Sequence, residues 1–310
     1  MIPSEFEYAR PASVGETLRL LREREGEAKV LSGGYSLIPL LKLRLAQPAL
    51  LVDIRDVDGL SVIAAGESPV GSAQGAPPDS AAQPADGELR SGARVTHAQV
   101  ERSELVARDY PLIADAVRGI GDRQVRNWGT VGGSLAHADP SADWPAVVIA
   151  LGASIVCRNV DAERVVPARE WFVGIFQTAL EPDELLTEIR IPHPGPRSSG
   201  AYEKLERRAG DFATVGVAAQ VRLDLDGRIA GAGIGVTGVG ETAFAATAAE
   251  AALAGKVPDE ALLRAAGEAA AAQARPTSDG HGPADYKRAM TSEMTVRALR
   301  RAIDRAAGRQ

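Results

Sequence analysis

The sequence predicts an α+β protein in two parts, an α/β region followed by an antiparallel sheet with helices. Helical and strand-like patterns alternate over roughly the first sixty residues, as in a compact α/β unit. Residues 202–236 have the pattern of an antiparallel meander, and Asp226-Gly227 is a strong hairpin turn. After Gly240 the chain is alanine-rich and helical in pattern. A chain of 310 residues with 45% hydrophobic content can bury a core of this size.

Capping residues mark the helices of the α/β region. Ser13 and Glu16 form a capping-box pattern before a helix that ends near Arg24. Ser36 is expected to cap a helix over residues 37–46, and Thr96 one over residues 97–103. The other elements predicted here are strands at 29–31, 50–54, 60–64, 88–94 and 185–192, helices at 111–119, 144–151 and 168–177, and a hairpin of 155–158 with 164–167.

We predict two domains from these patterns. The first spans residues 1–180 and divides into subdomains of about 1–58 and 59–180. Within it, residues 66–87 are rich in Gly, Pro, Ser and Ala, which predicts a flexible loop. The second domain spans residues 181–310, with a three-stranded antiparallel sheet and three helices at 242–253, 259–274 and 284–307.

Two double-glycine loops are the most informative local feature. The first is Ser32-Gly33-Gly34-Tyr35-Ser36, and the second is Thr130-Val131-Gly132-Gly133-Ser134, which opens a helical stretch. Glycine allows close approach of a ligand, and successive N–H groups at such turns bind anions. One such loop is a weak indication, because 32 glycines in the chain produce chance pairs. Two loops of matching chemistry indicate one ligand with two linked phosphates.

Composition excludes several classes of function. The net charge of −6 argues against a nucleic-acid partner, which needs clustered cations. Cys157 is the single cysteine, so the chain can form neither a disulfide nor an iron–sulfur cluster of its own, and we expect a buried strand thiol there. The histidines show no metal-ligand spacing. No signal core and no membrane-spanning stretch is evident, so we expect a soluble, cytoplasmic protein.

Residues 233–238 match the dinucleotide-binding fingerprint, but we interpret them differently. A Rossmann unit needs a parallel strand after the fingerprint helix, whereas a second helical pattern follows here. A glycine-rich strand packed against small neighbours is the favoured interpretation. No catalytic triad or Walker loop is present either, so we predict no catalytic residue and no metal ligand. A diphosphate-binding protein without such machinery relies on the chemistry of its cofactor.

Five stretches of the chain resemble the medium, FAD-binding subunit of molybdenum hydroxylases, the carbon monoxide dehydrogenase and xanthine dehydrogenase family. They are residues 29–54, 127–145, 184–192, 202–214 and 278–288. The resemblance covers essentially the whole chain apart from residues 66–87. It implies a two-subdomain FAD-binding domain of the vanillyl-alcohol-oxidase (PCMH) type, followed by the C-terminal domain.

The resemblance also implies roles for individual residues. The two glycine loops would hold the FAD pyrophosphate through N–H groups and hydroxyls, and Asp143 would bind the ribose or adenosine side, with His137 nearby. Lys204 would lie near the flavin ring, or else be a solvated strand lysine; Phe212 would flank the ring, or else be a core aromatic. Leu186 would line the ring pocket. The full set of implied FAD-binding residues is Lys29, Leu31, Ser32, Gly33, Gly34, Tyr35, Ser36, Leu37, Gly129, Thr130, Gly133, Ser134, His137, Asp143, Leu186, Lys204 and Phe212.

Three positions depart from the family pattern. The family often has Ala and His where this chain has Ser32 and Tyr35, and Asn where it has Ser134. A serine keeps a hydroxyl but lacks the donor and acceptor ends of an amide. The glycines that permit close approach of phosphate are all present.

The function that the resemblance implies is electron transfer. FAD on this chain would take electrons from [2Fe-2S] clusters of a small partner subunit and pass them to quinone, oxygen or NAD. A large molybdopterin subunit would choose and oxidise the substrate, and the assembly would be a dimer of heterotrimers, a heterohexamer. Two alternatives stay open, a self-sufficient FAD-dependent oxidase or reductase of the same fold and a flavin-free assembly or scaffold protein.

Overall fold

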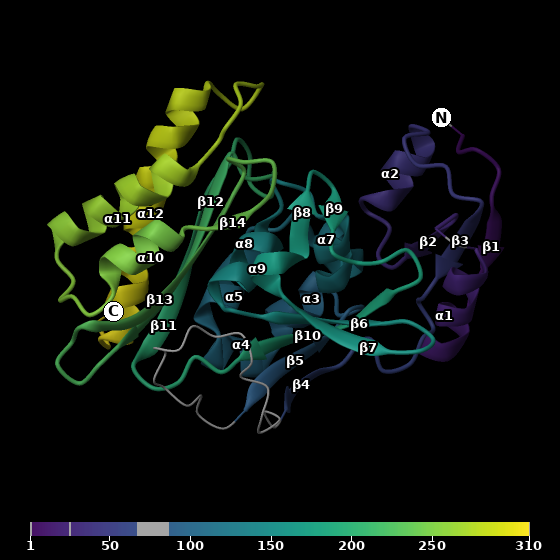
Figure 1. Ribbon diagram of the computed structural model, residues 1–310, viewed down its shortest axis with the longest axis horizontal. Coiled ribbons are helices and arrows are strands. Elements are labelled where there is room, and N and C mark those ends of the chain that lie inside the picture. Colours follow the sequence, from purple (N-terminus) through teal and green to yellow (C-terminus); the bar gives the residue numbers. More distant parts are fainter. Residues whose placement is uncertain (1, 25, 67–86, 310) are drawn as a thin grey trace.

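The N-terminal unit is a small parallel sheet with two helices. In the sequence, one helix comes before the second strand and the other comes after it. The computed structural model describes residues 2–24, 26–66 and 87–309. The strand order is β1-β3-β2, and both neighbours run parallel to β3. Figure 1 shows this unit at one end of the molecule, farthest from the C-terminal helices. Its elements are β1 (Glu7–Ala9), α1 (Val14–Glu23), β2 (Ala28–Leu31), α2 (Leu37–Lys42) and β3 (Leu50–Asp53).

The middle unit is built around an antiparallel sheet with the order β4-β5-β10-β6-β7. Its core joins the sheet to helices α5, α7 and α8 through two buried tryptophans, Trp144 and Trp171. The strands are β4 (Ile63–Gly66), β5 (Glu88–Gly92), β6 (Ser154–Arg158), β7 (Glu163–Pro167), β8 (Phe172–Gly174), β9 (Gln177–Thr178) and β10 (Leu185–Pro192). The helices are α3 (His97–Arg102), α4 (Glu104–Asp109), α5 (Pro111–Arg118), α6 (Arg123–Trp128), α7 (Val131–His137), α8 (Asp143–Ala150) and α9 (Ala168–Trp171).

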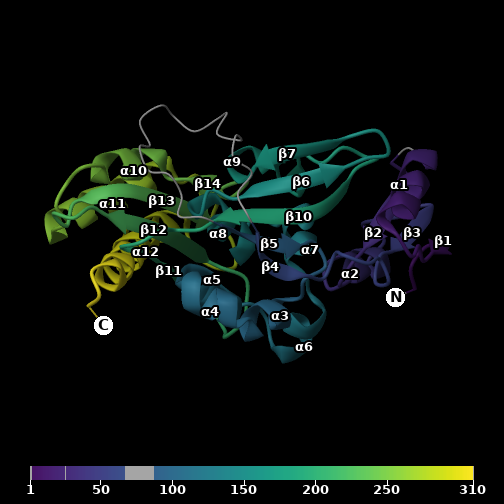
Figure 2. The same ribbon diagram turned by 90° about the horizontal axis from the view of Figure 1, so that it is seen from below.

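The C-terminal unit is a four-stranded antiparallel meander buried on both faces. Its order is β11-β12-β13-β14, and helices cover one face, as both views show (Figures 1 and 2). Alternate side chains of β12, such as Val217 and Val221, join the core under those helices, whereas Ala218 joins the core of the middle unit. The elements are β11 (Ser198–Leu205), β12 (Val215–Leu223), β13 (Ile229–Thr237), β14 (Phe244–Ala245), α10 (Thr247–Leu253), α11 (Glu260–Gln273) and α12 (Ala284–Ala306).

The predicted α+β fold is confirmed, and several local predictions hold closely. Ser13 and Thr96 both accept a hydrogen bond from the backbone N–H three residues on, and Thr96 forms a complete capping box with Gln99. The predicted hairpin is β6–β7, and Asp226-Gly227 lies in the turn between β12 and β13. Cys157 is fully buried in β6, where burial raises the pKa of its thiol to about 12.

Three local predictions were wrong. The helix expected over 168–177 is only the short α9, because the chain then forms the β8–β9 hairpin. The helix expected over 37–46 ends at Lys42, and the Ser36 side chain does not cap it. The meander has a fourth short strand, β14, where a helix was expected to begin. Most of the predicted flexible loop at 66–87 lies outside the described residues.

The position of β10 bears on where the two domains meet. Leu185–Pro192, which the sequence-based division assigns to the C-terminal domain, pairs with both β5 and β6 in the middle sheet. Local sequence patterns could not reveal this assignment, because the sheet to which a strand belongs depends on partner strands that are distant in the sequence. We therefore propose that the boundary lies between β10 and β11, after Pro192 and before Ser198 rather than at residue 180.

Close packing of a strand on a helix joins the middle and C-terminal units. A Cβ atom on Gly233 would lie 2.0 Å from the carbonyl oxygen of Ala150, and one on Gly235 would lie 2.0 Å from that of Ala146. Both glycines lie in the interior of β13, and both carbonyls belong to α8. The interpretation of residues 233–238 as a glycine-rich strand is confirmed, because only glycine permits this approach of helix to strand.

Helix α12 is the longest helix and the last element of the chain. It carries Arg301 and Arg305, which both bind Asp115 of α5; Arg305 Nη1 lies 2.7 Å from the Asp115 carboxylate. The two arginines also donate to the carbonyl oxygens of Tyr202 and Gly200. In the part of the chain that the structure describes, no helix combines the length and apolarity needed to cross a membrane.

Candidate functional site

The two glycine loops, about a hundred residues apart in sequence, meet between the N-terminal and middle units. The first follows β2, and the second contains Thr130, the N-cap of α7. The Oγ atoms of Ser32 and Thr130 lie 3.0 Å apart, within hydrogen-bond distance. A Cβ atom on Gly33 would lie 2.1 Å from the carbonyl oxygen of Trp128, so a side chain at this position would force the loops apart. The loops therefore form one site.

Main-chain donors of the first loop are free to bind a ligand. The N–H groups of residues 33–37 donate to no other residue within 2–24, 26–66 and 87–309. Gly34 has a φ of +83°, a conformation that favours glycine and that turns the chain into α2. Consecutive free N–H groups at the start of a helix create a concavity for an anion. Tyr35 beside them is 44% exposed.

The second loop has different chemistry, because its N–H groups from Val131 to Ser134 already have protein acceptors. Val131 and Gly132 donate to the carbonyl oxygens of Val95 and Ala93, at 2.9 and 3.0 Å. Gly133 donates to Thr130 Oγ1 at 3.1 Å, and Ser134 to the Thr130 carbonyl oxygen. The Ser134 hydroxyl has no hydrogen-bond partner among the described residues. Residues 131–134 consequently offer the Ser134 hydroxyl rather than N–H groups to a ligand.

Asp143 and Lys204 form a buried cluster with Tyr202. Lys204 Nζ lies 3.1 Å from Asp143 Oδ2 and donates to the Gly119 carbonyl oxygen at 2.9 Å. The Tyr202 hydroxyl donates to Asp143 Oδ1 at 2.6 Å. Burial raises the pKa of Asp143, while the charge of Lys204 and the Tyr202 hydrogen bond oppose the rise; burial and then the Asp143 charge raise the pKa of Tyr202. Since the Lys204 side chain is only 7% exposed, it is not a solvated strand lysine.

Two exposed aromatic side chains bear on the predicted site. Phe212 is 51% exposed, so it is not a core aromatic and is accessible to a ligand. Phe176, in the turn of the β8–β9 hairpin, has its ring centroid 5.0 Å from that of His137. Burial is the main cause of the lowered pKa of His137, so the imidazole is neutral at pH 7.

Three other predicted site residues lie in different surroundings from one another. Leu186 is buried in the core of the middle unit, paired with Cys157 across β10 and β6. Lys29 is exposed on β2 and lines a surface hollow together with Leu45 and Pro48. Gly129 is buried and accepts a hydrogen bond from the His97 N–H. The structure thus brings the two loops together and joins Asp143 to Lys204, but it surrounds Leu186 with core residues.

Trp144 and His97 form a hydrogen-bonded pair next to Gly129, which directly precedes the second loop. Trp144 Nε1 donates to His97 Nδ1 at 3.1 Å, and a Cβ atom on Gly129 would lie 2.9 Å from the His97 ring. Burial is the main cause and nearby Arg126 a secondary cause of the low pKa of His97, about 4. The imidazole is therefore neutral in the folded protein at pH 7.

We expect His97 to make the protein less stable in acid. The unfolded chain has an ordinary histidine pKa near 6.5, so it binds a proton before the folded protein does. The free energy of unfolding should fall as pH drops from about 6.5 to about 4, by roughly 3 kcal/mol in total. Urea unfolding at several pH values measures this. His97→Gln keeps an acceptor for Trp144 but cannot titrate, so the difference between variant and wild type should shrink toward acid pH; a constant difference would contradict the assignment.

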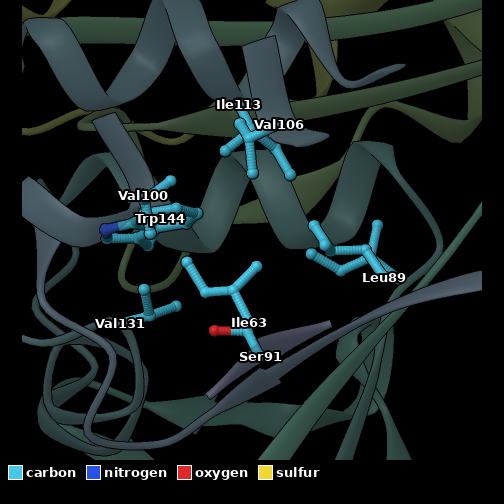
Figure 3. Close-up of a pocket in the computed structure, with 9 residues that line it drawn as sticks. Ile63, Leu89, Ser91, Val100, Val106, Ile113, Val131 and Trp144 are labelled. Carbon is cyan, nitrogen blue, oxygen red and sulfur yellow. The ribbon is translucent and has the colours of Figure 1, made fainter. Parts of the chain in front are cut away.

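A small apolar cavity lies under the middle sheet and is not the functional site (Figure 3). Its volume is about 10 Å³. The polar groups in its lining are the Ser91 hydroxyl and the indole N–H of Trp144, which His97 accepts. A cavity without a charged or titratable side chain has no means of binding a diphosphate.

Three residues with a place in the site were not identified from sequence. Tyr202 holds Asp143, and its position two residues before Lys204 on a strand, which puts both side chains on one face, was an available signal. Trp128, whose carbonyl oxygen meets Gly33, directly precedes the second loop. Phe176 has a left-handed φ of +54°, which no sequence pattern reveals.

Comparison with protein families agrees with this geometry. Residues 4–194 match the FAD-binding domain of molybdopterin dehydrogenases, and residues 200–302 match the C-terminal domain of CO dehydrogenase flavoproteins. The carbon monoxide dehydrogenase medium chain of Hydrogenophaga pseudoflava is 38% identical over 307 residues, covering 99% of this chain and 100% of that one. The glyceraldehyde dehydrogenase medium chain of Sulfolobus acidocaldarius is 32% identical over 97% of this chain and 99% of that one.

Solved structures give the same result. The chain superposes on carbon monoxide dehydrogenase from Hydrogenophaga pseudoflava with a TM-score of 0.89, at 40% identity and with coverage of 97% and 98%. The match to quinoline 2-oxidoreductase from Pseudomonas putida 86 has a TM-score of 0.85 at 34% identity, with coverage of 99% of each chain. The resemblance inferred from sequence is confirmed. The chain belongs to the family of FAD-binding medium subunits of CO dehydrogenase-type molybdenum hydroxylases.

Proposed function

We propose that this chain is the electron-transfer subunit of a molybdenum hydroxylase. Its FAD takes electrons from [2Fe-2S] clusters of a small partner subunit and passes them to an external acceptor. The contact between the two glycine loops is the observation that carries the proposal, because it places the free N–H groups of the first loop beside the Ser32–Thr130 hydroxyl pair. The acceptor is quinone, oxygen or NAD.

Residues of both loops would bind the FAD diphosphate. The free N–H groups of residues 33–37 would bind one or both phosphates, in the manner of a helix-start anion site. The Ser134 hydroxyl, together with the Ser32–Thr130 hydroxyl pair, would bind from the other side. The second loop therefore contributes hydroxyls where the sequence alone suggested N–H groups.

The buried cluster would serve the ring end of the cofactor. FAD supplies the ability to exchange electrons singly or in pairs, which the protein side chains lack. Lys204 would place a fixed positive charge near the ring, and Tyr202 and Asp143 would hold its ammonium in one orientation. Asp143 has both carboxylate oxygens engaged in this cluster, so we propose a positioning role for it rather than a direct ribose contact. Phe212 would flank the ring.

Partner subunits are needed because the chain cannot hold the other redox centres. An iron–sulfur cluster takes four cysteine thiolates, or two with two histidines, and the only cysteine here is buried Cys157. We propose one small iron–sulfur and one large molybdopterin subunit per chain, assembled as a dimer of heterotrimers. A self-sufficient oxidase would need its own substrate base, and no described residue near the two loops fits that role.

The absorption spectrum of the purified chain tests the proposal. We expect a yellow protein with about one FAD per chain that oxidises no substrate by itself. Adding partner subunits loaded with their metals should then allow their substrate to bleach the flavin absorbance. A colourless chain that assembles normally would favour the scaffold alternative, and substrate-dependent bleaching without partners would favour the self-sufficient oxidase.

A further inference from the structure

Four charged side chains surround the free edge of β11. We define the β11 clamp as Asp115 of α5, Glu203 of β11, and Arg301 and Arg305 of α12. Arg305 binds both oxygens of the Asp115 carboxylate, with Nη1 2.7 Å from Oδ2 and Nη2 3.2 Å from Oδ1. Arg301 binds the same carboxylate and also Glu203, whose Oε1 lies 2.7 Å from Arg301 Nη1. With two guanidinium groups and two carboxylates, the charges of the clamp balance within the chain.

The two arginines also bind the backbone of β11. This strand lies at the end of the sheet order, so one of its sides pairs with no strand in the described part of the chain. Arg305 Nη1 donates to the Gly200 carbonyl oxygen at 2.8 Å, and Arg301 Nη2 donates to that of Tyr202 at 2.9 Å. Carbonyl groups two residues apart on a strand point to the same side. The clamp therefore ties the unpaired side of β11 to α5 and α12, between which the strand lies (Figures 1 and 2).

Helix α5 runs alongside β11 in a fixed register. Near the start of the helix, a Cβ atom on Gly200 would lie 2.8 Å from the Cβ atom of Leu112. At its end, the carbonyl oxygen of Gly119, the C-cap of α5, accepts a hydrogen bond from Lys204 Nζ at 2.9 Å. Asp115 lies between these contacts, four residues before Gly119 and on the same face of the helix. The clamp therefore limits how far α5 can slide along β11, and so fixes the place of Gly119 relative to Lys204.

We propose that Asp115 is a positioning residue for Lys204, acting through the β11 clamp. Lys204 Nζ has acceptors on three separate segments, which are Gly119 at the end of α5, Asp143 at the start of α8, and Glu206 after β11. The Asp143 and Glu206 oxygens each lie 3.1 Å from Nζ. The ammonium stays at one point only while α5, α8 and β11 keep their relative places, and the clamp joins two of these three. The inference rests on the proposed function, in which Lys204 lies near the flavin ring.

The clamp is better suited to fixing a position than to adding stability. Half-buried ion pairs contribute little net stability, because the loss of hydration offsets their attraction. Arg301 Nε is buried and has no hydrogen-bond partner among the described residues, which is a further cost. The planar guanidinium fork fixes the direction of each contact, so it holds a helix carboxylate and strand carbonyl groups in one geometry. An apolar cluster would supply burial without that direction.

The test is the midpoint potential of FAD bound to the full-length chain. Lys204→Met should lower the potential, because the fixed positive charge no longer favours the negatively charged reduced flavin. Asp115→Asn should lower it less, by about 30 mV, which corresponds to a roughly tenfold smaller preference for reduced FAD in a two-electron couple. FAD per chain should stay at the wild-type value. In the Lys204→Met background, Asp115→Asn should cause no further shift, because the clamp acts only through Lys204.

Two further variants separate positioning from a general loosening of α12. Arg305→Lys keeps the charge but cannot bind both Asp115 oxygens at once, so it should shift the potential in the same direction. This variant decides the question if Asp115→Asn does not fold. Glu260→Gln breaks the pair of Glu260 with Arg300, 2.8 Å apart, which ties α12 to α11 rather than to β11. It should leave the potential at the wild-type value.

A second measurement needs no flavin. A crystal structure of the FAD-free Asp115→Asn chain should show Lys204 Nζ beyond hydrogen-bond distance of the Gly119 carbonyl oxygen. An unchanged contact there would overturn the proposal, and so would wild-type potentials in Asp115→Asn and Arg305→Lys or an equal shift in Glu260→Gln. An unchanged potential in Lys204→Met would overturn the placement of Lys204 near the ring and the proposal with it, whereas a wild-type chain that binds no FAD would overturn the proposed function.

Discussion

Gly33→Val should reduce affinity for FAD about 100-fold or more and yield a nearly colourless protein. The first added atom would already lie 2.1 Å from the Trp128 carbonyl oxygen, so the two glycine loops must separate. Separation removes hydrogen bonds to the charged diphosphate, each of which contributes about 1.5–3 kcal/mol, and the loss of two gives the stated factor. Fluorescence titration of the apoprotein with FAD measures the effect.

A matched substitution controls for general effects of filling a glycine. Gly15 lies in α1, is exposed, and a Cβ atom there would have no atom within 4 Å, so Gly15→Ala should retain wild-type FAD affinity. Gly133→Val should also lose FAD, since its Cβ would lie 2.6 Å from Thr130 Oγ1 and displace the cap of α7. Folded Gly33→Val protein with one tightly bound FAD would show that the loops do not jointly form the cofactor site.

Gly235→Ala should lower the free energy of unfolding by about 3 kcal/mol, at the upper end of the usual overpacking range. The new Cβ would lie 2.0 Å from the Ala146 carbonyl oxygen. Neither the Cβ nor the carbonyl oxygen can move without its backbone, so α8 and β13 must separate. The same movement would disturb the Asp143–Lys204 pair, because Asp143 begins α8. Urea unfolding, with the flavin spectrum as a second probe, measures both consequences.

Gly231→Ala is the control for that substitution. Gly231 lies on the same strand, and its Cβ would approach only the Arg222 guanidinium, at 3.8 Å. Because side chains at residues 231 and 235 share a face of the strand, the two variants differ mainly in whether α8 lies opposite. We expect a change within about 0.5 kcal/mol for Gly231→Ala. Equal losses in the two variants would point to strand propensity rather than helix–strand contact as the cause.

Local sequence signals were reliable where the structure is determined locally. Thr96 with Gln99 fixes the start of α3, and Asp226-Gly227 fixes a hairpin turn, in both cases through hydrogen bonds or conformations of neighbouring residues. The expected helix at 168–177 failed for a tertiary reason. Trp171 is fully buried and donates to the Leu135 carbonyl oxygen, which anchors the end of α9 and lets the chain turn into the β8–β9 hairpin.

Some elements leave no periodic pattern to detect. Helix α6 buries none of its residues, so it has no apolar stripe, although Asp122 caps it through the Val125 N–H. Strand β10 belongs to the middle sheet through its pairing with β5 and β6, which its own residues do not specify. Arg44 ends α2 early in a conformation that a sequence suggests only when glycine is present.

The site residues also differ in how far the sequence could predict their grouping. The two glycine loops could be paired from sequence because their chemistry matches, and the Ser32–Thr130 contact agrees with that pairing. The grouping of Asp143, Tyr202 and Lys204 could not be found in this way, because it depends on the tertiary structure that brings two side chains of β11 to the start of α8. The sequence also could not predict that the two loops offer different groups to a ligand. That difference depends on tertiary hydrogen bonds, in which Val131 and Gly132 donate to Val95 and Ala93.

A crystal structure of the FAD-loaded chain tests the central claim most directly. The account predicts that the N–H groups of residues 33–37 lie within hydrogen-bond distance of the diphosphate oxygens, with the Ser134 hydroxyl reaching them from the opposite loop. A cofactor whose phosphates lie away from both loops, or touch the second loop only through displaced N–H groups, would contradict it.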